Sequence, residues 1–596
     1  MRLEAVDWIS VIAFFVISLL VGVVVARKAG KSSSDFFLSG RSMPWWLLGV
    51  SMVATTFSTD TPNLVSDIVR QNGVSGNWVW WAFLLTGMLT VFVYAKLWRR
   101  SGVMTDIEFY ELRYSGKTAA FLRGFRALYL GVFFNIVVMA SVTLAAIKIG
   151  SIMLDLKPWQ TVSIAATVTV AYSMLGGLKG VLITDFMQFG IAMFGAIMAA
   201  IIAVRHPAIN GLDGLLSHPN VINKLNFFPD FSNKDVLMAV FIIPLAVQWW
   251  SVWYPGSEPG GGGYLVQRML AAKDEKNALG ATLFFNVAHY ALRPWPWIIV
   301  ALCSLIVFPD LASLRAAFPN VNPAIVKHDM AYPAMLTFLP HGMLGLVVAS
   351  LIAAYMSTIS THLNWGSSYI VNDYYQRFIR PDATEKQLVR VGRISTLLLM
   401  VATCVLATFL ENSMQVFNLI LQIGAGTGLI FILRWFWWRI NAFSEISAMV
   451  VSFIVACYFN LIHNKIGGPH LEGWEMLILG IAITTFAWLL VTFLTKPTDK
   501  KTLYKFCSLV HAGGPGWNAV RKLAKEDGID IEKSGEKWDM PYGILCMVIG
   551  CVFVYASIFA TGFWIYGKII NATLLTILAA VSVVLLLKFW NKLNLE

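Results

Sequence analysis

Charged residues are scarce in this chain. Of its 596 residues, 13% are charged and 57% are hydrophobic. The apolar residues gather in runs of about twenty, the length that crosses a hydrocarbon core of roughly 30 Å. This composition excludes an ordinary soluble domain and predicts an all-α polytopic membrane protein with the lipid bilayer as its first partner.

Cysteine and histidine are also scarce. The six cysteines are scattered, five in apolar runs and Cys507 in a charged segment, without a CxxC pair or the spacing of a disulfide framework. Among nine histidines, His289 and His362 alone lie well within apolar runs, and HExxH is absent. A membrane enzyme would need a nucleophile and base, or metal ligands, at working spacing. We therefore expect no enzyme activity, no organic cofactor and no transition metal.

The apolar runs predict fifteen membrane spans. They lie at about residues 7–27, 44–70, 75–98, 122–152, 159–177, 180–204, 236–255, 276–307, 339–371, 387–411, 415–438, 440–463, 472–496, 541–565 and 567–590.

The charges flanking the first span predict the orientation. Glu4 and Asp7 precede it, and Arg27, Lys28 and Lys31 follow it, so the N-terminus should lie outside and the C-terminus in the cytoplasm. With alternating spans, most of the 45 Lys and Arg residues fall in inner loops. The net charge of +12 therefore reports topology, and its spread over many loops argues against a nucleic-acid partner. We expect a bacterial inner (plasma) membrane protein, with no obligate protein partner indicated.

Two spans are interrupted. Residues 52–63, MVATTFSTDTPN, place four threonines, a serine, an acid and a proline inside an apolar run, and residues 253–264, WYPGSEPGGGGY, hold two prolines and five glycines. The second stretch cannot be continuous helix. The first has a simpler alternative, in which Ser and Thr bond back to their own helix. Asp60 argues against that alternative, since an acid at this depth costs about 2.5 to 3.5 kcal/mol.

The interruptions occupy matching positions. Each opens a group of five spans, and an odd number of spans per group inverts the second group relative to the first. Paired broken helices in inverted halves indicate a secondary transporter with its site at mid-bilayer. The predicted organisation is an extra helix and inner loop (1–43), a first repeat (44–204), an outer loop (205–235), an inverted second repeat (236–438), two further helices (439–496), a charged cytoplasmic loop (497–540) and two C-terminal helices (541–596).

Two further segments are notable. The ninth span places hydroxyls at residues 357, 358, 360 and 361, although small residues there would also suit close helix packing. The loop 497–540 mixes both charge signs, which is typical of a solvated connector with one short amphipathic helix.

Three motifs carry a resemblance to a known family. Ser34–Trp46 (SDFFLSGRSMPWW), Gly176–Gln188 (GGLKGVLITDFMQ) and Gln267–Lys273 (QRMLAAK) occur in that order. They resemble the sodium:solute symporter family, which includes bacterial proline, sugar and sialic acid carriers. The resemblance covers roughly residues 5–460 and implies a LeuT-type fold of five plus five inverted helices, with one extra N-terminal and four extra C-terminal helices. It also implies sodium-coupled import of a small organic solute by alternating access.

The family resemblance implies a sodium site between the first break and the ninth span. Its ligands would be the carbonyls of Ala54, Phe57 and Ala354 and the hydroxyls of Ser357 and Thr358. A hard cation suits oxygens of this kind, and an unwound turn supplies free carbonyls.

Asp185 matches an acid that the family places near the sodium exit path. It would serve as a relay or as a ligand of a second site. The alternative is a first-turn Asp after a Gly176–Gly177 turn, which stabilises a helix N-terminus by about 0.3 to 1 kcal/mol.

By the same resemblance, the solute site lies between the broken helices. The candidate residues are Thr56, Asp60, Thr61, Trp253, Tyr254, Tyr290, Arg293 and Gln422. Arg293 could clamp a carboxylate, or it could pair with Asp60 or Glu258 as a structural group. The sequence therefore leaves a sugar, an amino acid or a carboxylate open as the solute. A transporter-like sensor, an ion channel and a proton-coupled carrier remain alternative functions.

Overall fold

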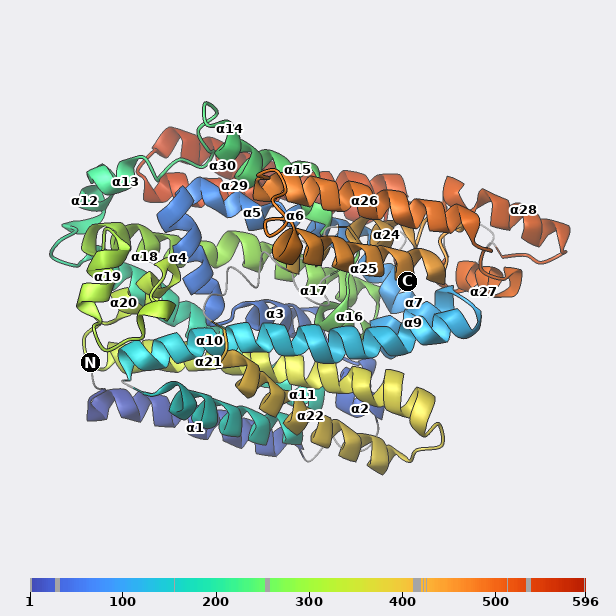
Figure 1. Ribbon diagram of the computed structural model, residues 1–596, viewed down its shortest axis with the longest axis horizontal. Coiled ribbons are helices and arrows are strands. Elements are labelled where there is room, and N and C mark those ends of the chain that lie inside the picture. The colour runs from blue at the N-terminus through green and yellow to red at the C-terminus, as the bar shows by residue number, and fades with distance from the viewer. Residues whose placement is uncertain are drawn as a thin grey trace.

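The structure is a computed structural model, and it describes residues 3–26, 33–154, 156–251, 258–410, 420–421, 423–424, 426–511, 513–531, 538–593 and 595. The described residues are almost entirely helical. Long helices run side by side along one direction, with α12 (Gly211–Ser217), α13 (Pro219–Ile222) and α19 (Leu311–Ala317) at one end (Figure 1). The helices α27 (Lys500–Val510) and α28 (Asn518–Glu526) lie at the other end, toward which the C-terminus also lies.

Ten stretches of the described residues are long and apolar enough to cross a membrane. The other predicted spans are the first, the two broken ones, 159–177, and 415–438, part of which lies outside the described residues. The chain is therefore a multi-pass membrane protein.

The first repeat begins with the first broken helix. Its elements are α3 (Trp45–Thr56), α4 (Asp60–Asn72), the span from η2 (Val74–Asn77) through α5 (Trp78–Trp81), α6 (Leu84–Leu89) and η3 (Thr90–Tyr94) to α7 (Ala95–Ser101), the span from α9 (Gly116–Leu128) through η5 (Tyr129–Phe134) to α10 (Asn135–Met153), and α11 (Pro158–Val204).

The second repeat begins with the second broken helix. Its elements are α14 (Lys234–Leu237), η6 (Met238–Ile242), α15 (Ile243–Ala246), η7 (Gln248–Trp250) and α16 (Gly263–Ala271), then α17 (Glu275–Val287), η8 (Ala288–Leu292) and α18 (Pro294–Val307), then α21 (Met343–Ser368) with η11 (Tyr369–Ile379), α22 (Glu385–Ala407) and α24 (Gly428–Leu433).

Five helices lie outside the repeats. They are α1 (Ala5–Ala26), α25 (Ala442–Cys457), α26 (Gly473–Leu494), α29 (Met540–Ile565) and α30 (Ile569–Trp590). With the two repeats they make up the predicted LeuT-type architecture.

The element α11 (Pro158–Val204) covers both of the spans that the sequence predicts at 159–177 and 180–204. Ala165 shares a cavity wall with Leu351, while Gly195 packs against Ser350. Residues 165 and 195 would be about 45 Å apart along a straight helix, so the chain reverses between them. The two predicted arms therefore lie side by side.

A short pairing joins the two broken helices at one end. The N–H of Met43 donates to the carbonyl of Ala271 (3.1 Å), and the N–H of Lys273 donates to the carbonyl of Met43 (3.2 Å). The start of α3 is thereby tied to the end of α16.

The segment 497–540 is more ordered than a solvated connector. It forms two helices, and α27 buries Phe506 and Val510. Trp517, just before α28, stacks on Phe506 and donates from its indole to the carbonyl of Trp435 (2.9 Å). Burying these rings against α24 and its neighbours holds the segment on the protein.

Candidate functional site

The first helix break lies at Phe57–Thr59. The helix α3 ends at Thr56, Phe57 has φ −91° and ψ 77°, and α4 begins at Asp60. The N–H of Phe57 donates to the carbonyls of Val53 (2.9 Å) and Ala54 (3.1 Å). Pro62, in the first turn of α4, cannot donate to a preceding helix and therefore favours the interruption here. The break predicted from the sequence is present.

The helix α21 packs directly against this break. The hydroxyl of Thr358 donates to the carbonyl of Thr55 (2.7 Å) at the end of α3. Ala354 and Ser357 lie within one turn of it on α21, and all five predicted sodium-site residues are buried, each at most 2% exposed. The structure thus brings the two predicted halves of the sodium site together.

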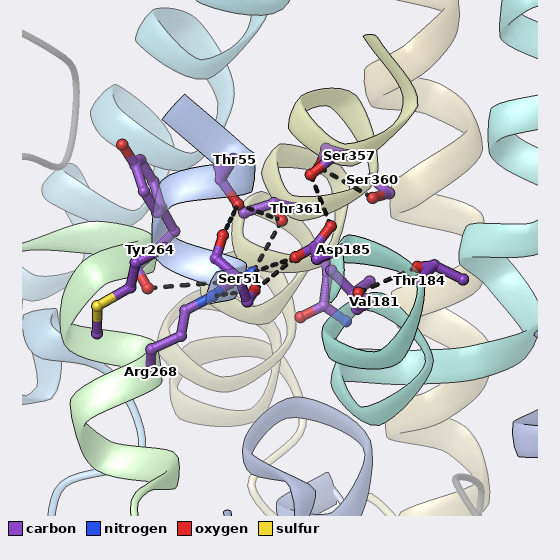
Figure 2. A network of polar contacts seen from close by, with 12 residues as sticks. Ser51, Thr55, Val181, Thr184, Asp185, Tyr264, Arg268, Ser357, Ser360 and Thr361 are labelled. Atoms are coloured by element: carbon purple, nitrogen blue, oxygen red, sulfur yellow. Dashed lines mark hydrogen bonds and ion pairs between the residues drawn. The ribbon is translucent and has the colours of Figure 1, made fainter. Parts of the chain in front are cut away.

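Asp185 joins the same place from α11. Its carboxylate accepts from the hydroxyls of Ser51 (2.5 Å) and Ser357 (2.6 Å), so it bridges α3 and α21 (Figure 2). A buried carboxylate with several hydroxyls around it forms a set of oxygen ligands that suits a hard monovalent cation.

Arg268 of α16 completes the network of Figure 2. Its guanidinium donates to Thr361 (2.8 Å) and Ser51 (3.2 Å) and lies 3.9 Å from Asp185. The second broken helix therefore contacts the oxygens around the first. Arg268 lies in the motif Gln267–Lys273, and its place at this site was not predicted from the sequence.

Ser51, Thr55 and Thr361 were also missed as site residues. Thr55 and Thr361 are 3.0 Å apart through their hydroxyls. The available signal was spacing, because Ser51 and Thr55 are four residues apart on α3, and Ser357 and Thr361 are four apart on α21. Each pair therefore occupies one helix face.

Two of the predicted solute residues, Thr56 and Arg293, are in direct contact. Arg293 donates to the hydroxyl of Thr56 (3.1 Å), and its other terminal nitrogen lies 3.0 Å from His289 Nε2. The same guanidinium lies over the ring of Trp297. Tyr290, next to His289, stacks on Trp80 with ring centroids 5.7 Å apart.

The other candidates are divided. Asp60 accepts from the hydroxyl of Ser58, and the hydroxyl of Thr61 donates to the carbonyl of Thr56 (3.3 Å), so both lie at the first break. Trp253, Tyr254 and Gln422 fall outside the described residues.

A small cavity lies beside the second break, where residues of α6, η3, α17 and η8 line it. Its volume is about 30 Å³, which is room for about two water molecules. Its polar lining comes from Thr86, Thr90, Thr282, Asn286, Tyr290 and Glu258. Among the described residues the Asn286 carbonyl oxygen has no hydrogen-bond partner. Gly87 makes room for it, because a side chain at 87 would occupy the same space.

The second break is held by buried charges. Glu258 pairs with Arg126 of α9 and Arg434 (3.3 Å), and Arg434 also lies 3.5 Å from Glu445. All four side chains are at most 4% exposed. We call Arg126, Glu258, Arg434 and Glu445 the charge cluster. Glu258 thus pairs with Arg126 and Arg434, whereas Arg293 contacts Thr56 and His289.

The backbone of the second break depends on glycine. Gly260 (φ +83°) and Gly261 (φ +94°) adopt left-handed conformations, and Trp98 donates from its indole to the carbonyl of Gly260 (2.7 Å). The helix α16 then starts at Gly263, whose N–H donates to Asp106 (2.8 Å). Burial raises the pKa of Asp106 above its ordinary value, although the hydrogen bonds from Tyr369 and Gly263 oppose this.

Comparison with known proteins identifies the family. The model of the sodium:solute symporter family matches residues 36–452. The chain belongs to this family. The chain is 26% identical over 468 residues to a sodium/glucose cotransporter of Vibrio parahaemolyticus, covering 76% of this chain and 84% of the relative. A human sodium/myo-inositol cotransporter 2 is also 26% identical, covering 74% of this chain and 67% of the relative.

A solved structure agrees in fold. A Na⁺-coupled sialic acid symporter in a substrate-bound outward-open state superposes with a TM-score of 0.66 at 21% identity, covering 83% of this chain and 99% of that chain. This symporter-family chain is therefore a sodium-coupled secondary symporter with a LeuT-type fold.

Proposed function

We propose that this symporter imports a neutral, polyhydroxylated solute and binds Na⁺ at the contact of the first break with α21. The ligands would be the carbonyls of Ala54, Phe57 and Ala354 with the hydroxyls of Ser357 and Thr358. Two adjacent hydrogen bonds support this assignment: the Thr358 hydroxyl donates to the Thr55 carbonyl, and the Ser357 hydroxyl donates to the Asp185 carboxylate. Asp185 would serve as a relay or second-site ligand.

The lining of the cavity beside the second break favours a polyhydroxylated solute. Its walls offer Thr hydroxyls and the unpaired Asn286 carbonyl oxygen, which would accept a hydrogen bond from a solute hydroxyl. Rings such as Tyr290 suit the apolar face of a sugar. The glucose and myo-inositol cotransporters among the relatives support the same class.

A carboxylate solute is less well supported. Arg293 donates to Thr56 and lies against His289, so a carboxylate would have to displace these contacts. Glu258, at the cavity wall, would repel an anion wherever its pairing with Arg126 and Arg434 is incomplete.

Sodium coupling is sufficient for accumulation. One Na⁺ crossing about 100 mV gains about 2.3 kcal/mol, and a tenfold gradient adds about 1.4 kcal/mol. Together these could hold a neutral solute at several-hundredfold accumulation. We expect an N-terminus outside and a C-terminus in the cytoplasm of a bacterial inner membrane, with the charge cluster near the cytoplasmic side.

The test is solute uptake into proteoliposomes under an imposed sodium gradient. A panel would contain hexoses, inositols, amino acids and sialic acid, each measured with sodium, potassium or proton gradients. Sodium-dependent uptake of a hexose or inositol is expected. Uptake of the carboxylates alone, or uptake driven equally by protons, would contradict the proposal.

Site variants separate binding from coupling. Asn286→Ala should weaken apparent solute affinity by about 5- to 30-fold, since it removes the unpaired acceptor, while sodium dependence remains. An unchanged solute affinity would remove Asn286 from the site.

Patch recordings that show continuous sodium conductance without solute would favour a channel.

A further inference from the structure

An apolar cavity lies beside the contact of α1 with the transport core. Its volume is about 150 Å³, and its walls come from α1, α10, α11 and α21. These helices lie side by side in Figure 1, with α1 at the outside of the molecule. Val11 and Phe15 of α1 line it together with Leu351 and Ile352 of α21.

The walls of this cavity have few free hydrogen-bonding groups that could bind water. The hydroxyl of Thr59 donates to the carbonyl of Val142 (3.3 Å), and the Tyr355 hydroxyl lies 3.3 Å from that of Thr143. Thr161 is the wall hydroxyl that lacks a partner among the described residues. A water needs at least two partners, and an apolar cavity of this size stays dry and accepts an apolar guest.

The cavity opens toward the lipid. Trp8 and Ile164 line it and are 46% and 53% exposed. Beyond them, Ile9, Ile12 and Trp159 are also largely exposed, and in a multi-pass protein such an apolar surface contacts the bilayer. The molecules that can enter sideways are therefore hydrocarbon chains.

The mouth also has a feature that suits a phospholipid. Lys157 is exposed and directly precedes α11, next to Leu156, which lines the cavity. Trp8 and Trp159 at the same end are typical of the membrane interface. We propose that this cavity binds one acyl chain of a phospholipid whose phosphate lies beside Lys157.

The bound chain contacts both elements of the proposed sodium site. Tyr355 follows Ala354 on α21, and Thr59 belongs to the first break. The outer helix α1 is tied to the start of α21, because Asp7 accepts from the N–H groups of Gly342 (2.7 Å) and Gly345 (2.8 Å). The acyl chain thus fills the cavity beside the contact of α1 with α21.

Photolabelling tests the proposal. The full chain is reconstituted in phosphatidylethanolamine vesicles that contain a small fraction of a phospholipid with a diazirine at the end of one acyl chain. After illumination, labelled residues are mapped by peptide mass spectrometry. Label on Tyr355 and Met356, both 2% exposed, is expected, since an acyl chain reaches them through the cavity.

Cavity-filling variants supply the comparison. Ala165→Phe and, from the opposite wall, Ala146→Leu should each reduce this label to background, whereas Val584→Phe on the lipid-facing side of α30, 65% exposed, should not. If Tyr355 and Met356 remain unlabelled in the wild type while Leu587 is labelled, or if the label persists in both filled variants, the proposal is wrong. The wild-type experiment decides even if a filled variant fails to fold.

Lys157→Gln tests the headgroup. The label on Tyr355 should fall when the probe is an anionic phosphatidylglycerol at low abundance. A diazirine-bearing alkane, which has no headgroup, should label equally in wild type and variant. If phosphatidylglycerol labelling is unchanged, a phosphate beside Lys157 is excluded.

Discussion

The two broken helices are built from different chemistry. The first break is surrounded by hydroxyls and carbonyls, with the carboxylates of Asp60 and Asp185 beside it. The second break has a glycine backbone and is held by the charge cluster. Both are buried, so both had to satisfy their free backbone groups without water.

This difference in chemistry indicates different roles for the two breaks. The hydroxyl, carbonyl and carboxylate oxygens at the first break can receive a cation, and the ion pair beside them is the one between Arg268 and Asp185 at 3.9 Å. Paired charges at the second break favour one arrangement strongly, because each partner left alone in the protein is costly. We infer that the first break binds the ion and that the second holds a conformation.

The largest effect should come from the charge cluster. Glu258→Ala leaves Arg126 and Arg434 without this partner, and breaking a buried pair typically costs about 3 to 5 kcal/mol. Thermal unfolding of the purified protein in detergent should show a large loss of stability or failure to fold. Glu526→Gln on α28, which is exposed, is the matched control. A stable Glu258→Ala protein would show that the second break does not depend on charge.

A smaller effect is expected from the glycines of the second break. Gly261→Ala requires a left-handed alanine, which costs about 1 to 2 kcal/mol, and its Cβ would lie 3.1 Å from the Trp98 indole. A total loss of about 2 to 3 kcal/mol follows. Gly180→Ala, with no atom within 4 Å of the added Cβ, should be neutral or stabilising. Equal stability of the two variants would refute the backbone argument.

The first break should respond in ion binding instead. Ser357→Ala and Thr358→Val each remove one proposed ligand oxygen, which should weaken apparent sodium affinity by about 5- to 30-fold, or roughly 1 to 2 kcal/mol. Sodium-dependent uptake at varied sodium concentration measures this. Ser350→Ala removes a hydroxyl bonded to its own helix, at Val347, and should leave sodium dependence intact. Unchanged dependence in the first two variants would place the sodium site elsewhere.

Sequence pattern predicted the breaks because proline and consecutive glycines disfavour a continuous helix. Pro62 and the four consecutive glycines 260–263 interrupt apolar runs visibly, so their positions follow from local chemistry. The family motifs then related the first break to α21, and the contact between Thr358 and Thr55 agrees with this.

The charge cluster could not be predicted in the same way. Arg126, Glu258, Arg434 and Glu445 are separated by many residues along the chain, and sequence cannot show which buried charges meet. Their pairing depends on the packing of α9 and α24 around the break.

The smallest expected effect concerns His341, which lies just before the start of α21. His341 lies 2.8 Å from Asp7 and 3.4 Å from Glu4, and the hydrogen bond with Asp7 raises the pKa of His341 above its ordinary value of about 6.5. Protonated His341 therefore adds stability that is fully present below about pH 6.5 and is lost as pH rises through the raised pKa. Thermal unfolding should show a small decline in wild type between about pH 6 and 8 that is absent in His341→Gln. The same decline in both proteins would show that α1 is tied to α21 by the backbone contacts of Asp7 alone, independently of this charge.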